Sequence, residues 1–390
     1  MDLNKSMERY LEDLVRIDTC QPLGREQDAV DYIRREVTTW SGHCETTVLD
    51  HGNHRQSLIL TCSGSKTTGG LAFVTHLDTV EISDRHAWHH DPLGACRDSG
   101  RLHGRGSSDM KSGAAIMLAL AEYLVNGTKQ LESPVLFCFT ADEERDGTGA
   151  KALAESGLMA GIDAMIIPEP TGNRLAVSEK GALWLRFTVR GKAAHGSTPQ
   201  HGNNAIDRAI DLLDRMRPCL DTETADPLLG RSSMTVTRFE AGIGTNIVPD
   251  LATLEFDLRT IPGVLHEEII AEADTIAERL VSEHENLSID LSVLNNRAAV
   301  GTDPADPFVT RLLREREHFI PDKEPAKGMA YYTDASQLVP AVGCPFVIMG
   351  PGEEALAHQV NESVSLAACK TTLSIFKSYL DHHCFVENES

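Results

Sequence analysis

Short apolar runs alternate with helical patterns between residues 71 and 170, and this alternation limits the folds that the chain can adopt. The runs "LAFVTHL", "PVLFCFTAD" and "DAMIIPEP" have the length and composition of buried strands, whereas "GAAIMLALAEYLV" and "GAKALAES" between them are typical of helices. Strands that alternate with helices predict a parallel arrangement with helices on the faces of the sheet. We therefore expect an α/β domain with a mixed, mainly parallel sheet flanked by helices.

A second pattern begins near residue 182, where apolar and polar residues alternate. Its segments follow the order strand, helix, strand, strand, helix, strand, over residues 182–191, 204–216, 233–242, 252–260, 266–283 and 287–294. This order predicts a ferredoxin-like α+β module. Turn-rich segments resume at about residue 296, so we expect one domain built from residues 1–181 and 296–390, with a second domain, residues 182–295, inserted into it.

The composition excludes several classes of partner. A net charge of −22 over 390 residues repels nucleic acids and anionic membrane surfaces. No apolar run is long enough to cross a bilayer, and the first residues, "MDLNKSMERY", lack the apolar stretch of a signal peptide. The nine cysteines contain no C-x-x-C pair, which favours reduced thiols over a disulfide framework. We expect a cytoplasmic protein that binds neither nucleic acid nor membrane.

His76 and Asp78 interrupt the end of an apolar strand. Side chains of a strand repeat every two residues, so both point to the same face. His76 could therefore bind a metal ion while Asp78 accepts its second ring N–H or orients it from behind. The alternative for an isolated motif is a core histidine with a satisfied hydrogen bond.

Further candidate ligands follow other predicted strands or precede a predicted helix. They are Asp109, the acidic run Asp142, Glu143 and Glu144, then Glu169, and finally His358. Catalytic groups in such sheets lie just past the carboxyl ends of strands, so we expect these side chains to converge. Taken singly, Asp109 could cap a helix and the acidic run could be a solvated turn.

Clustered carboxylates repel one another and lose hydration unless cations or protons intervene. Two histidines and several carboxylates at separate strand ends are the side chains expected for two divalent metal ions that share an aspartate. Imidazole and carboxylate donors favour zinc, with cobalt or manganese as alternatives.

Other candidate residues lie outside this group. His195 stands in a glycine- and serine-containing loop, Asn246 follows a glycine-rich stretch, and Arg259 ends a predicted strand, where it could pair with a substrate carboxylate. Gly350 and Gly352 could bring backbone donors near a ligand. The alternatives are an exposed loop histidine, a surface ion pair and a simple turn.

Taken in order, these motifs make the chain resemble a family of metallo-aminoacylases and peptidases. That family includes acetylornithine deacetylase, succinyl-diaminopimelate desuccinylase, aminoacylase and glutamate carboxypeptidase. The matching stretches are "THLDTV", "WHHDPLG", "GRGSSDMKSG", "ADEERDGTGA", "PEPTG", "GKAAHGSTP", "NIVPD", "DLRT", "TDAS", "GPG" and "AHQVNE", which run in family order from residue 75 to 362.

The resemblance implies a role for each matching residue. His76 and Glu169 would bind one metal ion, Glu144 and His358 the other, and Asp109 would bridge the two. Asp78 would support His76, Glu143 would be the general base, and Arg259 would hold a substrate carboxylate. The inserted domain would serve as lid and dimerisation domain, and His195 would reach into the active site of a second copy of the chain to polarise the scissile carbonyl.

The function that follows is hydrolysis of the amide bond of a small N-acyl amino acid by a metal-activated water, in a homodimer. The alternative is a carboxypeptidase or dipeptidase, from which pocket shape would distinguish it. A noncatalytic homologue would lack the base or a ligand, and all of these are present. The stretch "SEKG" replaces a histidine-containing segment of acetylornithine deacetylases, which weakens acetylornithine as the substrate. We assign no role to His86, His89 and His90, which surround Trp88.

Overall fold

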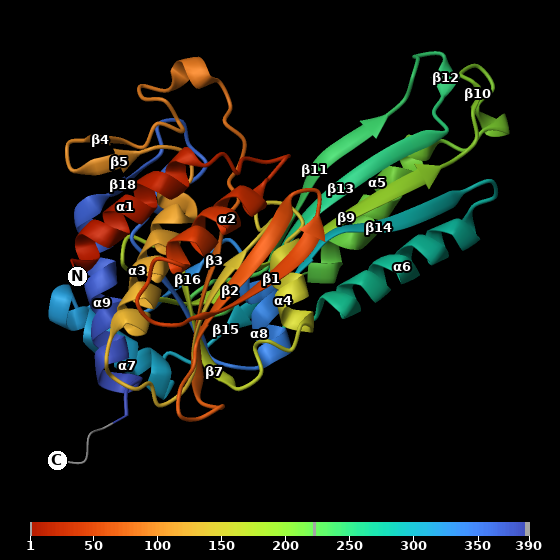
Figure 1. The fold of residues 1–390 in the computed structure, drawn as a ribbon. Coiled ribbons are helices and arrows are strands. Elements are labelled where there is room, and N and C mark those ends of the chain that lie inside the picture. Colours follow the sequence, from red (N-terminus) through yellow and green to blue (C-terminus); the bar gives the residue numbers. More distant parts are fainter. Residues whose placement is uncertain (1, 221–223, 387–390) are drawn as a thin grey trace. The chain divides into compact units, whose positions relative to one another are not determined.

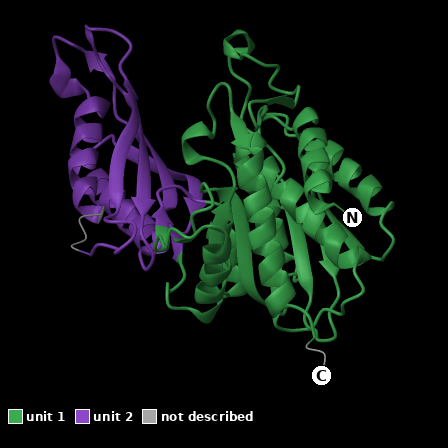
Figure 2. Cartoon of the chain, turned by 90° about the vertical axis from the view of Figure 1, so that its left-hand side faces the viewer, with its two compact units in different colours: residues 1–177, 301–327, 333–390 green, residues 178–300, 328–332 purple. Residues whose placement is uncertain are grey.

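The computed structural model describes residues 2–220 and 224–386 and divides the chain into two compact units (Figure 1, Figure 2). Unit 1 comprises residues 1–177, 301–327 and 333–390, and unit 2 comprises residues 178–300 and 328–332. The boundaries predicted from the sequence were 181/182 and 295/296. Unit 2 therefore extends a few residues beyond the predicted insertion at each end. Unit 2 also takes a short stretch, residues 328–332, that the sequence pattern did not assign to it.

Unit 1 begins with two helices and three strands, and its helices and strands alternate from α3 to β7. The helices are α1 (Leu3–Arg16), α2 (Glu26–Val37), α3 (Ser112–Asn126), α4 (Thr148–Glu155), α7 (Pro307–Phe319), α8 (Ala335–Val342) and α9 (Leu366–His383). The strands are β1 (Glu45–Gly52), β2 (Arg55–Cys62), β3 (Gly70–His76), β4 (Cys96–Asp98), β5 (Arg101–His103), β6 (Val135–Thr140), β7 (Ile162–Pro170), β17 (Phe346–Gly350) and β18 (Ser363–Ser365). Strands β8 (Ala176–Glu179), β15 (Val300–Gly301) and β16 (Lys327–Met329) include residues of both units.

The main sheet of unit 1 has the strand order β1-β2-β6-β3-β7-β17-β8-β15, with β16 beside β8. Its central strands β6, β3, β7 and β17 are parallel, whereas β1, β2 and β8 pair with their neighbours in antiparallel fashion. The central strands are buried on both faces, which explains their nearly continuous apolar sequences. This arrangement confirms the predicted α/β fold with a mixed, mainly parallel sheet.

Helices cover both faces of this sheet (Figure 1). The chain leaves β3 through α3 to reach β6, and then crosses back through α4 to reach β7 on the other side of β3. Right-handed crossovers that run in opposite directions place their helices on opposite faces. On one face, Phe73 of β3 stacks on Phe137 of β6 at a centroid distance of 5.2 Å and meets Phe376 of α9 edge-on at 5.4 Å.

A small sheet with the order β18-β5-β4 lies outside the main sheet. Its central strand β5 pairs with β4 through Cys96↔His103 and with β18 through Ser363↔His103. This sheet joins the hairpin that precedes α3 to the final segment of the chain, because β18 directly precedes α9.

Unit 2 is an antiparallel sheet with two helices, in the predicted order. Its strands are β9 (Gly181–Arg190), β11 (Ser233–Ala241), β13 (Leu251–Thr260) and β14 (Ser288–Arg297), its helices are α5 (Ala205–Met216) and α6 (His266–Glu283), and β10 (Ala194–His195) pairs with β12 (Ile247–Val248). The sheet order is β11-β13-β9-β14. Alternate residues of β9 and β13 are buried against the helices, as the alternating sequence pattern indicates. None of the helices in the described ranges is long and apolar enough to cross a bilayer.

Candidate metal centre

The centre lies where the carboxyl ends of three neighbouring parallel strands meet. His76 is the last residue of β3, the acidic run 142–144 follows β6, and Glu169 is the next-to-last residue of β7. Strand β3 lies between the other two, at the point where the connections change direction. Such switch points leave a crevice beyond the strand ends, and this is where α/β sheets bind their ligands.

Asp109 lies between the two histidines. One carboxylate oxygen, Oδ1, lies 3.3 Å from His76 Nε2, and the other, Oδ2, lies 3.3 Å from His358 Nε2. Asp109 itself stands in a turn, Ser107–Lys111, that precedes α3, and not at the helix cap that its sequence position also allowed. A carboxylate that presents one oxygen to each of two imidazoles has the geometry of a bridge between two cations.

Each histidine also faces one glutamate. His358 Nε2 lies 3.0 Å from Glu144 Oε2, and His76 Nε2 lies 3.8 Å from Glu169 Oε1. Donor atoms of His76, Asp109 and Glu144 all lie within 4.8 Å of one another. The structure therefore brings all five sequence-predicted ligands together, as two histidine–glutamate pairs on either side of one aspartate.

His76 is oriented by the backbone of Asp78. Its Nδ1 lies 2.9 Å from the carbonyl oxygen of Asp78, whereas the Asp78 carboxylate is 3.6 Å away. A carbonyl oxygen can only accept a hydrogen bond, so Nδ1 donates and Nε2 faces the cluster. The side chain of Asp78 instead accepts hydrogen bonds from the backbone amides of Glu143 and Glu144, at 3.0 and 3.1 Å. Asp78 thus fixes both His76 and the loop that carries the two glutamates.

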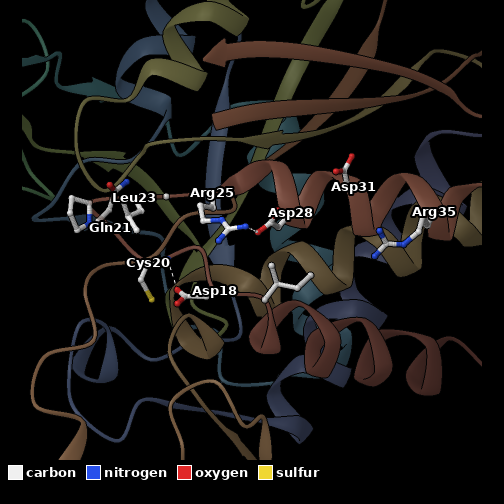
Figure 3. Close-up of a pocket in the computed structure, with 11 residues that line it drawn as sticks. Asp18, Cys20, Gln21, Leu23, Arg25, Asp28, Asp31 and Arg35 are labelled. Carbon is white, nitrogen blue, oxygen red and sulfur yellow. Dashed lines mark hydrogen bonds and ion pairs between the residues drawn. The ribbon is translucent and has the colours of Figure 1, made fainter. Parts of the chain in front are cut away.

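Gln21 supports Asp78 from the N-terminal part of the chain. Its Nε2 donates to Asp78 Oδ2 at 2.8 Å and lies 3.3 Å from Asp142 Oδ1. Arg55 in turn donates to the Gln21 side-chain oxygen at 2.7 Å and pairs with Asp142 at 2.9 Å. Gln21 also lines a surface pocket of about 590 Å³ formed by residues between 17 and 35 (Figure 3). No sequence signal pointed to Gln21, because its partner is 57 residues away.

Glu362 holds the turn that carries Asp109. Its buried carboxylate accepts hydrogen bonds from the backbone amides of Gly106, Ser108 and Asp109, at 2.9, 2.8 and 3.0 Å. It also pairs with the buried guanidinium of Arg105 at 2.7 Å. Glu362 ends the stretch "AHQVNE", so the motif contained this residue, although no role for it was predicted.

The charges of the cluster depend on one another. Burial lowers the pKa of His76, but hydrogen bonding to Asp109 and the nearby Glu169 outweigh this effect and raise its pKa well above the ordinary value. Hydrogen bonds to Asp109 and Glu144 raise the pKa of His358 to about 10. Burial, followed by the charge of Asp109, raises the pKa of both Glu144 and Glu169. Protons therefore offset the negative charge when no cation is bound.

This donor set fits two divalent cations. Imidazole nitrogens and carboxylate oxygens bind zinc-like ions, and two divalent cations would offset the negative charge of these buried carboxylates. Glu143 is buried beside this group, with its backbone amide bonded to Asp78. Its charge contributes to raising the pKa of both His76 and Glu169, which places its carboxylate near these two residues.

Gly350 and Gly352 lie close to the strands and turns that carry the ligands. A Cβ atom on Gly350 would come within 2.2 Å of the carbonyl oxygen of Pro168, next to Glu169, and one on Gly352 would come within 2.3 Å of the carbonyl oxygen of Ser108, next to Asp109. These glycines therefore allow β17 and its following turn to approach the ligand-bearing backbone closely.

The remaining predicted residues belong to unit 2. His195 is exposed in β10, and its Nδ1 lies 2.7 Å from Ser197 Oγ. The carbonyl oxygen of Asn246 accepts a hydrogen bond from the amide of Gly196 at 2.8 Å, which ties Asn246 to the loop of His195. Arg259 is paired with Asp257 through Nε at 2.9 Å, and its side chain remains 28% exposed. An ion pair was one of the two interpretations of Arg259 that the sequence allowed.

A family model described as peptidase family M20/M25/M40 matches residues 72–382, which is most of the chain. The chain belongs to this family of metal-binding hydrolases, as its motif order predicted.

Relatives and solved structures agree with this assignment. The chain is 27% identical to a probable succinyl-diaminopimelate desuccinylase of Staphylococcus aureus, over 95% of this chain and 96% of that protein. It is 30% identical to an acetylornithine deacetylase of Myxococcus xanthus, over 96% of this chain and 97% of that protein. Its fold is similar to that of an M20 family metallo-carboxypeptidase from Sulfolobus solfataricus, with a TM-score of 0.76, 15% identity and coverage of 96% and 98% of the two chains.

Proposed function

We propose that this protein hydrolyses the amide bond of a small N-acyl amino acid, as a dinuclear metal-dependent deacylase. The observation that carries the proposal is the position of Asp109, whose two carboxylate oxygens each lie 3.3 Å from a different histidine. The similarity to a desuccinylase and a deacetylase supports a small N-acyl amino acid as substrate.

Two divalent metal ions, zinc by preference of the donor set and otherwise cobalt or manganese, would lower the pKa of a shared water and stabilise negative charge on the substrate oxygen. Glu143 is the general base: it takes the proton of the attacking water and passes it to the departing amine. Asp78 keeps this base in place, because its carboxylate accepts hydrogen bonds from the backbone amides of both Glu143 and Glu144. His76, Glu169, Asp109, Glu144 and His358 are the metal ligands of the proposal.

Arg259 binds the carboxylate of the substrate amino acid. Arg259 uses Nε and Nη2 to bind Asp257. Because a guanidinium has five N–H donors, the others remain for a second carboxylate. Asn246, Gly350 and Gly352 complete the proposed substrate-binding set through polar and backbone groups. A carboxypeptidase or dipeptidase would use the same arginine. Because the fold is similar to that of a metallo-carboxypeptidase, peptide substrates are included in the test below.

A homodimer formed through unit 2 would bring His195 of one copy to the active site of the other. Unit 2 exposes large apolar side chains between β11 and the start of β13, namely Ile243 at 84%, Leu251 at 45%, Phe239 at 41% and Ile247 at 38% exposed. Ile247 is the direct cross-strand partner of His195. Such apolar side chains favour a protein partner over water.

The nine cysteines support the proposal that the enzyme works in the cytoplasm. All nine are free thiols, and five of them are buried: Cys44, Cys62, Cys138, Cys344 and Cys369. Free thiols persist in a reducing compartment.

The test of the proposed activity is amine release from N-acetyl, N-succinyl and N-formyl amino acids and from dipeptides. Metal-free and zinc-reloaded protein are compared, with metal content measured in parallel. Hydrolysis of one acyl class that appears only on reloading supports the deacylase. Faster cleavage of dipeptides than of every N-acyl amino acid supports the peptidase, and two bound metal ions without turnover of any substrate contradict both.

The role of His195 is tested by mixing two inactive variants, Glu143→Gln and His195→Ala. If His195 acts in the partner subunit, a mixed dimer contains one active site with Glu143 in one chain and His195 from the other, and activity returns on mixing. If His195 acts within its own chain, each mixed dimer lacks one of the two groups at every site, and the mixture stays inactive.

A further inference from the structure

Two histidines and one aspartate form a separate cluster on the surface of unit 1. Donor atoms of His90, Asp98 and His103 all lie within 4.8 Å of one another, and the rings of His90 and His103 have a centroid distance of 4.7 Å. None of the three belongs to the proposed dinuclear centre. We propose that they bind a third divalent transition-metal ion, with zinc as the representative ion.

The β4–β5 hairpin positions two of the three ligands. Asp98 is in β4 and His103 in β5, and the cross-strand pairs Asp98↔Arg101 and Cys96↔His103 place both side chains on the same face of the hairpin. His90 comes to this face from the loop that precedes β4. The three side chains are thus held by two different segments, which a bound ion would link.

The two arginines of the hairpin, Arg97 and Arg101, form their ion pairs with glutamates. Arg101, the cross-strand partner of Asp98, pairs with Glu353 at 2.6 Å and donates to Ser363 Oγ at 2.9 Å. Arg97 pairs with Glu8 at 2.6 Å and with Glu12. Both arginines of the hairpin therefore bind other groups. Asp98 accepts a hydrogen bond from Ser99 Oγ at 3.1 Å and lies next to the two imidazoles.

The donor types select the class of ion. Two imidazoles and one carboxylate suit zinc, copper, nickel or cobalt, whereas magnesium and calcium prefer oxygen donors. A tetrahedral zinc ion with bonds of about 2.0–2.1 Å holds its ligand atoms about 3.3 Å apart, so small rotations of these partly exposed side chains complete the set. Three protein ligands leave one position for water. Asp98 is exposed and the two histidines are only half-buried, whereas His76 and Glu169 of the dinuclear centre are buried, which indicates a weaker site.

The segments that carry this cluster are bonded to the segment that carries His358. The side chain of Asn361 accepts a hydrogen bond from the amide of His89 at 2.7 Å, and Ser363 is the direct cross-strand partner of His103. A third ion would therefore hold the His90 loop against the strands that border residues 358–362.

The experiment counts metal ions on full-length protein that already holds two equivalents of zinc. Equilibrium dialysis against rising free zinc is expected to add a third equivalent to the wild type. The variants His90→Ala and His103→Ala are expected to bind the third equivalent at least about tenfold more weakly. Even the loss of a hydrogen-bond partner behind a metal ligand weakens metal binding by about 10–100-fold. The matched control is His86→Ala, which removes an exposed histidine of the same loop that is outside the cluster.

Two further measurements keep the outcome clear. Asp98→Asn changes only an exposed carboxylate and is expected to weaken the third equivalent while leaving the first two in place. A zinc anomalous-difference map of the wild type should show a peak among the three side chains. The proposal is overturned if the wild type stops at two equivalents, or if His103→Ala and Asp98→Asn bind the third as tightly as His86→Ala does. Neither result depends on catalytic activity.

Discussion

The carboxylate of Glu362 accepts a 3.0 Å hydrogen bond from the backbone amide of Asp109, the residue that lies between the two histidines of the metal centre. Glu362 also accepts hydrogen bonds from the backbone amides of Gly106 and Ser108, and it forms an ion pair with Arg105. One buried carboxylate therefore sets the backbone position of the proposed bridging ligand.

Glu362→Gln should destabilise the protein, because Arg105 would be left as a buried charge without its counterion. Breaking a buried ion pair costs about 3–5 kcal/mol, and we expect a loss in this range by urea unfolding of the metal-free protein. The exposed pair Lys66–Glu132 provides the control: Glu132→Gln should change stability by less than about 1 kcal/mol. Equal effects of the two variants would contradict the role given to Glu362.

Glu143→Ala should retain two metal ions and lower kcat by about 10²–10⁴-fold, since a general base is lost while the ligands remain. Glu144→Ala, one residue away, should lose one of the two metal ions, because Glu144 faces His358 at 3.0 Å. Metal analysis and steady-state kinetics on both variants distinguish the roles. Full activity in metal-loaded Glu143→Ala would remove Glu143 as the base.

Metal affinity should rise with pH. In the metal-free protein the pKa of His358 is raised to about 10 by Asp109 and Glu144, so at pH 7 the imidazole is protonated and must lose its proton before it can bind an ion. Each proton released increases the apparent affinity about tenfold per pH unit below that pKa. Calorimetric titration in buffers with different ionisation heats should show proton release, and His358→Ala should release fewer protons.

The same pKa predicts the pH dependence of stability in the metal-free protein. A folded-state pKa above the unfolded value of about 6.5 stabilises the fold fully below pH 6.5, and this contribution is lost as the pH rises towards about 10. The thermal unfolding midpoint of the metal-free protein should therefore fall as the pH rises over this window. The metal-loaded protein, in which His358 is already neutral, should lack this component, and a matching decline in both forms would contradict the assignment.

Arg259→Gln should lower kcat/KM about 10–100-fold for substrates with a free carboxylate, because a charge-assisted hydrogen bond contributes about 1.5–3 kcal/mol. The matched comparison is the same substrate with its carboxylate converted to an amide, for which wild type and variant should differ little. A similar loss on both substrates would assign Arg259 a structural role through Asp257.

Gly350→Ala should destabilise unit 1, since the added Cβ would lie 2.2 Å from the carbonyl oxygen of Pro168 and would push β17 away from β7. Overpacking of this kind costs about 1–3 kcal/mol. Gly244→Ala is the control, because a Cβ there meets its nearest atom at 3.6 Å. The measurement is the midpoint of unfolding for each variant.

The local sequence pattern predicted the fold and the cluster of ligands for a simple reason. Buried parallel strands are apolar throughout, so polar residues such as His76 and Glu169 at their ends are conspicuous, and parallel strands bring their carboxyl ends to one edge. The contacts of Gln21 and Glu362 could not be predicted in this way, because their partners lie far along the chain and no periodicity relates them. The β4–β5–β18 sheet was missed because its three-residue strands are too short to show a pattern.

The order of the ligands along the chain has a consequence for synthesis in the cell. His76, Asp109, Glu144 and Glu169 all precede the inserted unit 2, whereas His358 follows it. During translation the nascent chain therefore carries four of the five proposed ligands before unit 2 is made, and His358 follows only after unit 2. A chain interrupted after unit 2 would lack His358, so the proposed dinuclear centre would be complete only once the segment that follows unit 2 has been made.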